Sequence, residues 1–223
     1  MFFDFPAAPR PGSTSPMQFQ RAHVSTVRSI RHVSLIRDWH RFRGGNELPE
    51  FADFVPDERS GDAAELLISE VMHQDNKPRY RCRTAGERVE QIYGYDMAAR
   101  FLHECLDPAM AKAAQPIWDG CVTSKLPVYS ILPLVDRDGH PVTVEQLFLP
   151  YGCGTGEVDF IVAALHAWST EGRFHIHGLY RDLPKAPLHW AVIVDPEMTA
   201  PPRSAESVGG DEIVFVDEVR RGA

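Results

Sequence analysis

The sequence predicts an α+β domain over residues 62–170, with a five-stranded antiparallel sheet and short helices on one face. Two runs of alternating apolar and polar residues come first and flank a turn. Helical periodicity replaces this pattern over residues 87–124, and three more strand-like runs follow, ending at Trp168. Because all these helices fall in one connection between strands, we expect them to cover one face of the sheet.

A short helix and a hairpin open the domain. We expect a helix over "DAAELL" (62–67), followed by two strands, "LISEVMHQ" and "PRYRCRTA", because the turn residues 75–77 separate them. "ERVEQIY" then spaces its apolar residues like one helix face, and Gly94 is placed to end that helix, where positive φ is often needed. A second helical segment is predicted over "DMAARFLHECL", residues 96–106.

The longest helix of the domain has a clearly marked start. Asp107 suits the N-cap, and Pro108 suits the first helical position, where its missing N–H is not needed. Pro116 lies inside the helix and predicts a kink or a break. The residues spaced to face inward are Met110, Ala114, Ile117 and Cys121.

Three strands are predicted to close the domain: "VYSILPLV", "PVTVEQLFL" and "EVDFIVAALHAW". "DRDG" joins the first two as a hairpin turn, and "PYGCGTG" joins the last two. A glycine-rich loop that leads into a strand does not fit a dinucleotide-binding fingerprint, which must lead into a helix. We therefore interpret the second connection as a hairpin loop.

The segments that flank the domain carry weaker patterns. Residues 1–23 are rich in proline and serine and predict a flexible arm, and residues 24–45 predict a helix that stops at a Gly-Gly pair. Leu35, Trp39 and Phe42 form an apolar stripe on this helix. Residues 171–223 are expected to be a partly ordered or disordered extension. Its two strand-like runs, "LHWAVIV" and "EIVFVDEV", could pair with each other, or the second could order only on a partner.

Composition limits the classes of function. The chain has 223 residues, 43% hydrophobic residues and a net charge of −8, and its longest apolar run is half the length of a membrane span. The N-terminus lacks the pattern of a secretory signal, so we expect a cytoplasmic protein. An acidic body disfavours nucleic-acid binding, and the arginines of residues 24–43 are interpreted as a solvated helix face. The four cysteines match no zinc, redox or disulfide spacing.

Four stretches, taken in order, resemble bacterial PAS domains of the PAS_5 type. They are "LIRDWHRFRGGNELP", "RYRCRTAGERVEQIYGYDM", "LPVYSILPLVDRDGHPV" and the closing strand after it. The sequence departs from the usual pattern at Thr84, Glu87 and Ala99. The resemblance implies a non-enzymatic module that acts in sensing or protein interaction in bacterial signalling. It also implies a small ligand between the sheet and the helices, or dimerisation through the N-terminal helix, and it carries no catalytic residues.

These expectations select two sets of candidate residues, and they identify no cofactor. Leu35, Trp39 and Phe42 are the candidates for contact with a second copy or with a signalling partner. The candidate ligand pocket consists of apolar and aromatic residues that are expected to point between the sheet and the helices, and filling of the core is the competing interpretation. They are Val71, Tyr80, Ile92, Tyr93, Leu102, Ile117, Leu132 and Phe148.

Two other classes of function remain as alternatives. A haem-based or metal-based redox or gas sensor would use histidines, with His73 or His103 as haem ligands. A metal site would draw on the later histidines, His166, His175, His177 and His189. A small enzyme would use Cys153 as a nucleophile, although the sequence shows no base beside it.

Overall fold

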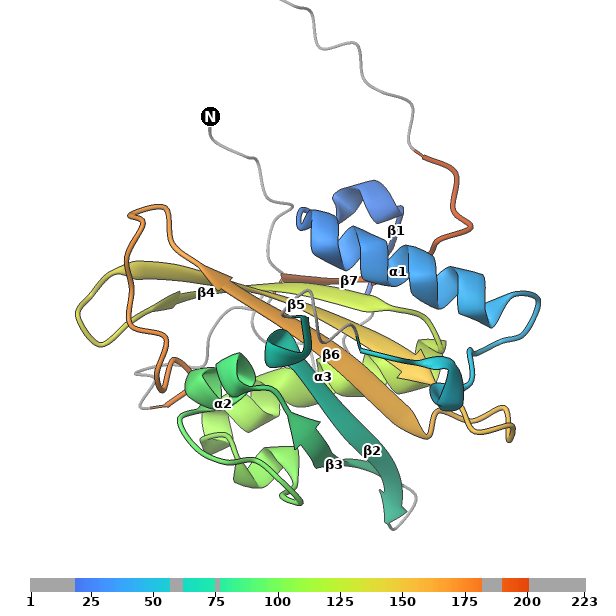
Figure 1. The fold of residues 1–223 in the computed structure, drawn as a ribbon, viewed down its shortest axis with the longest axis horizontal. Coiled ribbons are helices and arrows are strands. Elements are labelled where there is room, and N and C mark those ends of the chain that lie inside the picture. Colours follow the sequence, from blue (N-terminus) through green and yellow to red (C-terminus); the bar gives the residue numbers. More distant parts are fainter. Residues whose placement is uncertain (1–18, 57–61, 75–76, 182–189, 201–223) are drawn as a thin grey trace, which may run out of the picture.

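The computed structural model describes residues 19–56, 62–74, 77–181 and 190–200. Its strands form one mixed sheet of seven strands. The spatial order is β1-β7-β4-β5-β6-β2-β3 (Figure 1). All neighbouring pairs are antiparallel except β1 and β7, which are parallel. The strands are β1 Arg21–Ala22, β2 Leu66–Gln74, β3 Lys77–Ala85, β4 Val128–Val135, β5 Pro141–Tyr151, β6 Phe160–Trp168 and β7 Trp190–Val194. The prediction of five antiparallel strands is therefore incomplete, because it lacks β1 and β7.

Three α-helices lie on the two faces of this sheet. They are α1 Ile30–Arg43, α2 Glu87–Tyr93 and α3 Pro108–Ser124. The described residues also form short 3₁₀ helices, which are η1 Val24–Thr26, η2 Phe51–Asp53, η4 Asp62–Glu65 and η5 Leu102–Glu104. The helix α1 lies across one face, whereas α2 and α3 lie on the other (Figure 1). Gly94 ends α2 with a φ of 84°, as its position in the sequence predicts.

Two predicted helices are shorter in the structure because their residues pair with strands. Only Leu102–Glu104 of the segment 96–106 is helical, since residues 99–101 run along the edge of β3 instead. There the N–H of Cys82 donates to the carbonyl of Arg100 at 2.8 Å, and the N–H of Ala99 donates to the carbonyl of Cys82 at 3.0 Å. Likewise η4 ends at Glu65, because Leu66 already pairs with Ala164 of β6.

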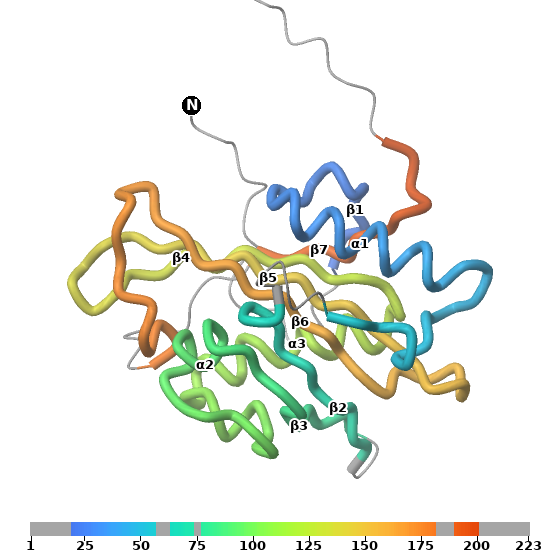
Figure 2. The backbone as a smooth tube through the Cα atoms, viewed as in Figure 1, coloured from blue at the N-terminus to red at the C-terminus, as the bar shows by residue number. Residues whose placement is uncertain are grey.

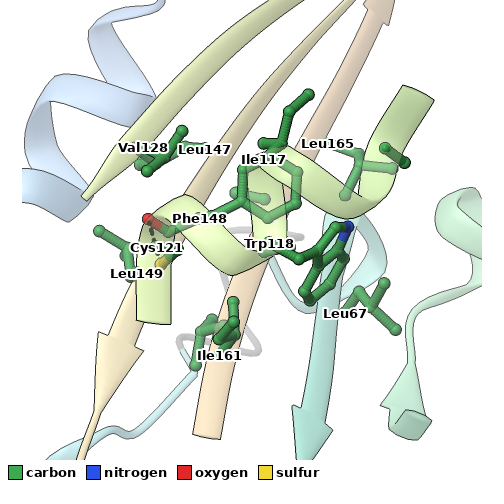
Figure 3. Close-up of a cluster of buried hydrophobic side chains, with 14 of the residues drawn as sticks. Leu67, Ile117, Trp118, Cys121, Val128, Leu147, Phe148, Leu149, Ile161 and Leu165 are labelled. Carbon is green, nitrogen blue, oxygen red and sulfur yellow. Dashed lines mark hydrogen bonds between the residues drawn. The ribbon is translucent and has the colours of Figure 1, made fainter. Parts of the chain in front are cut away.

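The long helix α3 anchors the main core. The side chain of Asp107 accepts hydrogen bonds from the N–H groups of Ala109 and Met110, which confirms the predicted N-cap. The helix continues through Pro116 without a break, since the carbonyl that loses its donor belongs to the exposed Lys112. All four predicted inward-facing residues of α3 are buried, and Figure 3 shows how the helix packs on the sheet.

The helix α1 docks through a face that differs in part from the predicted stripe. It begins only at Ile30, with Ser29 as its N-cap, and its buried residues are His32, Ile36, Trp39 and Arg43. Trp39 is fully buried and donates its indole N–H to the carbonyl of Pro150 at 2.7 Å. Leu35 is half-buried, and Phe42 is 41% exposed. Arg43 takes the last docking position, since its guanidinium lies 5.4 Å from the Trp39 ring centre.

Strands from both ends of the described chain, β1 and β7, form the edge of the sheet opposite β3. Of the two late strand-like runs, the first forms β7 between β4 and β1, and the second lies outside the described residues. The segment after β7 then passes beside α1, where Glu197 pairs with Arg43 (Figure 2). Asp195 pairs with Arg21 of β1 at 3.2 Å. The sheet thus extends beyond the predicted limits of the domain on both sides in sequence.

His32 is expected to make folding stability depend on pH. Its ring is 1% exposed and meets Tyr129 edge-on at 6.0 Å between ring centres. Burial, together with the charges of His166 and Arg31, lowers its pKa to about 3, against the opposing effect of Glu65. The unfolded chain therefore binds the proton first as the pH falls below about 6.5, and stability falls with pH in that range. At pH 5 the cost is about 2 kcal/mol relative to pH 7.

Urea denaturation at pH 5 and pH 7 measures this dependence, with His32→Leu as the comparison. The leucine variant should lose most of the difference between the two pH values. His166 acts in the opposite direction, because its hydrogen bond to Glu65 raises its pKa and its contribution is lost as the pH rises. An unchanged pH dependence in His32→Leu would contradict the assignment to His32.

Candidate functional site

The residues predicted to line a ligand cavity lie mostly in a filled core. All except Val71 are at most 4% exposed, and Val71 is half-buried. The ring of Trp118 of α3 lies 4.9 Å from that of Phe148 between ring centres (Figure 3). The ring of Tyr80 lies 5.1 Å from the same Trp118 ring. Side chains from the sheet and from α3 therefore fill the space in which a ligand was expected.

A pocket opens beside this core, at the free edge of β3. Its volume is about 840 Å³, a size typical of small-ligand sites. It lies between the start of β3, the region around η5 and one side of α3. The lining residues are Lys77, Pro78, Arg79, Tyr80, Leu102, His103, Leu106, Ala111, Ala114, Gln115, Trp118 and Asp119.

A polar group of side chains lies on the α3 side of the pocket. The hydroxyl of Tyr80 donates to Oδ1 of Asp119 at 2.6 Å, and Nε2 of Gln115 donates to the same oxygen at 2.8 Å. Burial and the neighbouring carboxylate both raise the pKa of Tyr80, so its phenol stays protonated and remains a donor. Within the described part of the chain no hydrogen bond reaches Oδ2 of Asp119, which leaves that oxygen as an acceptor for a bound molecule.

The strand side of the pocket is basic. Lys77 and Arg79 both come from β3, and Arg79 lies 3.0 Å from Nε2 of His103. Since a guanidinium can only donate, this imidazole nitrogen accepts, and the other nitrogen carries the proton. The guanidinium of Arg79 also lies 4.8 Å from the ring centre of Phe101. Against one carboxylate, two permanent cations give this pocket a positive balance on a chain of net charge −8.

Sequence reasoning named two of the lining residues, Tyr80 and Leu102, as pocket candidates and His103 as a candidate haem ligand, but it missed the other polar ones. The signal for these was present in the predicted helix 108–124. Gln115, Trp118 and Asp119 stand at positions i, i+3 and i+4, so they share one helical face beside the predicted inward face. The position of this face over an open strand edge depends on tertiary structure.

The histidines do not assemble into a metal centre in the described part of the chain, where no group of three or more potential ligands is placed to hold an ion. His73 and His177 are exposed, and His103 lies at the pocket. His166 lies 3.5 Å from Glu65, and His175 lies 2.7 Å from Asp138. His189 lies outside the described residues.

Cys153 lacks the surroundings that activate a thiol. It is exposed in the loop between β5 and β6, and partial burial with the charges of Asp159 and Glu50 raises its pKa. A nucleophilic cysteine needs a lowered pKa, which a nearby cation or base would provide. The other three cysteines are buried.

Comparisons with known proteins support one family. The sequence model of PAS_5, described as a PAS domain, matches residues 27–166. One similar solved structure is an RNA-binding light-oxygen-voltage receptor, with 19% sequence identity and a TM-score of 0.33. The match covers 53% of the present chain and 35% of that receptor chain. The present chain therefore spans about a third of the length of the receptor chain. No curated protein matches.

The described helices are also too short or too polar to cross a bilayer. None of them provides the long apolar stretch that a transmembrane helix requires.

Proposed function

This chain belongs to the PAS_5 family of PAS domains, and from that premise we propose that it is a non-enzymatic sensory and interaction module of bacterial signalling. The observation that carries the proposal is the pocket at the edge of β3, which combines aromatic residues with polar side chains of both charges. We assign the input of the module to this pocket. The packed side chains between sheet and helices favour this position over the interior one that the sequence suggested.

The proposed output is a change in the packing of α1. One buried carboxylate, Glu65, links the elements concerned: it pairs with Arg31 of α1, with Arg88 of α2 at 3.0 Å and with His166 of β6 at 3.5 Å. Glu65 also directly precedes β2, which pairs with the pocket strand β3. A molecule that favours one position of β3 would therefore shift the population of α1 positions through this contact set.

The proposed partner surface is the outer side of α1. Leu35 and Phe42 are accessible there for contact with a second copy or with a signalling protein, whereas Trp39 is used inside the chain. Nucleic acid is not the proposed partner, because three of the four arginines of this helix are engaged in ion pairs. Arg31 pairs with Glu65, Arg41 with Asp38 at 2.9 Å and Arg43 with Glu197. A cytoplasmic location remains a prediction from the sequence.

Native mass spectrometry of the full chain, purified without additions, tests the proposal. Bound mass on each protomer, or a stable complex between copies, is the expected result. Ala111→Phe places a ring in the pocket and should abolish retained mass, whereas Ala109→Phe on the exposed side of the same helix should not. Equal retention in both variants would place the binding site elsewhere and contradict the assignment of the input to this pocket.

A further inference from the structure

The pocket at the edge of β3 carries opposite charges on two of its sides. Lys77 and Arg79 line its strand side, and the carboxylate of Asp119 lines its α3 side. The guanidinium of Arg79 is positioned by His103, whose Nε2 lies 3.0 Å away. A ligand with a single charge would complement one side of the pocket and lack a counterion at the other. The pocket therefore fits a molecule that is negative towards β3 and positive towards α3.

The α3 side offers hydrogen-bond acceptors to a ligand. Oδ1 of Asp119 already accepts from the hydroxyl of Tyr80 at 2.6 Å and from Nε2 of Gln115 at 2.8 Å. Within the residues that the structure describes, no hydrogen bond reaches Oδ2 of Asp119 or Oε1 of Gln115. An ammonium group donates three hydrogen bonds and accepts none, so it matches a pair of acceptors of which one is charged. A hydroxyl group would match the same acceptors without compensating the charge.

The side chain of Tyr80 sets the distance between the two charged sides. Its backbone lies in β3 and its hydroxyl bonds to Asp119 of α3, so the gap is about as wide as a tyrosine side chain is long. Burial and the neighbouring carboxylate raise the pKa of this phenol, which therefore stays protonated and keeps the contact. A ligand beside Tyr80 needs its two charged groups at opposite ends of a body of similar length. An α-amino acid, which carries both groups on one carbon, is too short.

The remaining lining of the pocket is mainly apolar. A hydrocarbon body is favoured there, because its contact with these side chains removes apolar surface from water on both partners. The rings of Tyr80 and Trp118, 5.1 Å apart between ring centres, both line the pocket and suit contact with a flat body. The apolar lining residues besides these two rings are Pro78, Leu102, Leu106, Ala111 and Ala114.

We propose that the pocket binds an amino carboxylate whose ammonium and carboxylate groups lie at opposite ends of an apolar body. This inference rests on the proposed use of the pocket as the input site and names the class of molecule bound there. The carboxylate of the ligand pairs with Lys77 and Arg79. Its ammonium group pairs with Asp119 and Gln115, and its apolar body covers Trp118. The volume of about 840 Å³ accommodates such a molecule.

Calorimetric titration of the full chain with para-(aminomethyl)benzoate tests the proposal. This rigid molecule carries an ammonium and a carboxylate group at opposite ends of a ring. We expect a dissociation constant of about 0.1 mM. Para-methylbenzoate lacks the ammonium group and benzylamine lacks the carboxylate, so each should bind about tenfold more weakly or worse. Absence of saturable binding of the amino carboxylate at about 10 mM, or equal binding of the three molecules, would overturn the proposal.

Two further molecules test the separation of the charges. Meta-(aminomethyl)benzoate holds the same two groups closer together, and glycine holds them on one carbon. Both should bind more weakly than the para isomer, because neither reaches both sides of the pocket at once. Binding of either molecule that is as tight as that of the para isomer would contradict the assignment of the two charged sides.

Substitution on α3 and NMR locate the bound molecule. Ala111→Phe places a ring in the pocket and should abolish binding, whereas Ala109→Phe, on the exposed side of the helix, should not. In the unchanged protein the side-chain amide signals of Gln115 and the indole signal of Trp118 should shift during the titration. Binding that leaves both signals in place, or that survives Ala111→Phe, would overturn the assignment to this pocket.

Asp119→Asn tests the ammonium site. Asparagine keeps a carbonyl oxygen for the hydroxyl of Tyr80 and removes the negative charge. The variant should bind para-(aminomethyl)benzoate and benzylamine about tenfold more weakly, and its affinity for para-methylbenzoate should not fall. A loss of equal size for all three molecules would reveal a structural role of Asp119 and contradict the ammonium site.

Lys77→Gln tests the carboxylate site with the opposite selectivity. It should weaken binding of para-(aminomethyl)benzoate and para-methylbenzoate about threefold, because Arg79 remains, and should leave benzylamine unaffected. Lys112→Gln is the matched control, since Lys112 is exposed on α3 outside the lining residues. Equal effects of the two lysine substitutions would contradict a carboxylate site on the strand side.

The outcomes separate this inference from the proposed function. A molecule of other chemistry that is retained in native mass spectrometry and lost in Ala111→Phe would overturn the inference and leave the sensory function in place. Binding of para-(aminomethyl)benzoate that leaves the NMR signal of the Trp39 indole unchanged would support the inference and contradict signalling through α1.

Discussion

Replacement of Trp39 by alanine is expected to lower the free energy of unfolding by about 3–5 kcal/mol. The ring is fully buried between α1 and the sheet, and its N–H donates to the carbonyl of Pro150. The alanine variant leaves a cavity at that place and also leaves the Pro150 carbonyl without its donor. Urea denaturation of the variant at pH 7, followed by circular dichroism, measures the loss.

Phe42→Ala is the matched control on the same helix. Its ring is 41% exposed and contacts the guanidinium of Arg41 at 5.0 Å, so its loss should cost less than about 1 kcal/mol. The two aromatic residues thus separate docking within the chain from contact with a partner. A loss for Phe42→Ala as large as that for Trp39→Ala would mean that the docking face of α1 has been assigned wrongly.

Replacement of Glu65 by glutamine is expected to cost about 2–3 kcal/mol. The carboxylate is buried and is shared by Arg31, Arg88 and His166. Burial alone would raise its pKa, but the hydrogen bond from His166 and the two arginines outweigh burial and hold that pKa below its usual value. Glutamine keeps the shape and removes the charge, which leaves Arg31, Arg88 and the protonated form of His166 without their counterion. The arginines reach solvent, which limits the loss.

Glu70→Gln provides the control, because Glu70 lies in the same strand region and also faces two arginines, Arg81 and Arg83. These groups are more exposed, so the expected cost is below about 1 kcal/mol. NMR titration gives a second measurement: the pKa of His166 should fall in Glu65→Gln and remain unchanged in Glu70→Gln. An unchanged His166 in both variants would remove Glu65 as the link between α1 and the pocket side of the fold.

Local sequence patterns were sufficient for most strands and for α3. The run 128–135 begins and ends as predicted, directly after Pro127 and directly before the "DRDG" turn. The start of α3 follows from Asp107 and Pro108, whose effects are confined to one helical turn. Where the determinants lie within a few residues, the sequence alone was enough to locate the element.

The failures share a physical cause, which is pairing with distant residues. The segment 96–106 has helical spacing, but Ala99 adopts a φ of 60° and its neighbours bond to the edge of β3. The strand β1 has only two residues, and its partner β7 lies at the other end of the chain. The pocket depends on the same contacts, since segment 99–101 pairs with β3 at Arg81 and Cys82, next to the pocket residue Tyr80. No pattern of spacing within one element carries that information.

The two edges of the sheet also differ in how they can form. The β2–β3 hairpin closes a very short loop, whereas the contact between Arg21 and Asp195 beside the β1–β7 pair joins residues 174 positions apart. Closing the longer loop costs more chain entropy, so that pair gains stability only after the central strands are in place. We therefore expect the β2–β3 hairpin, which borders the pocket, to form early. We expect the β1–β7 edge to form last and to be the first part to open when the protein begins to unfold.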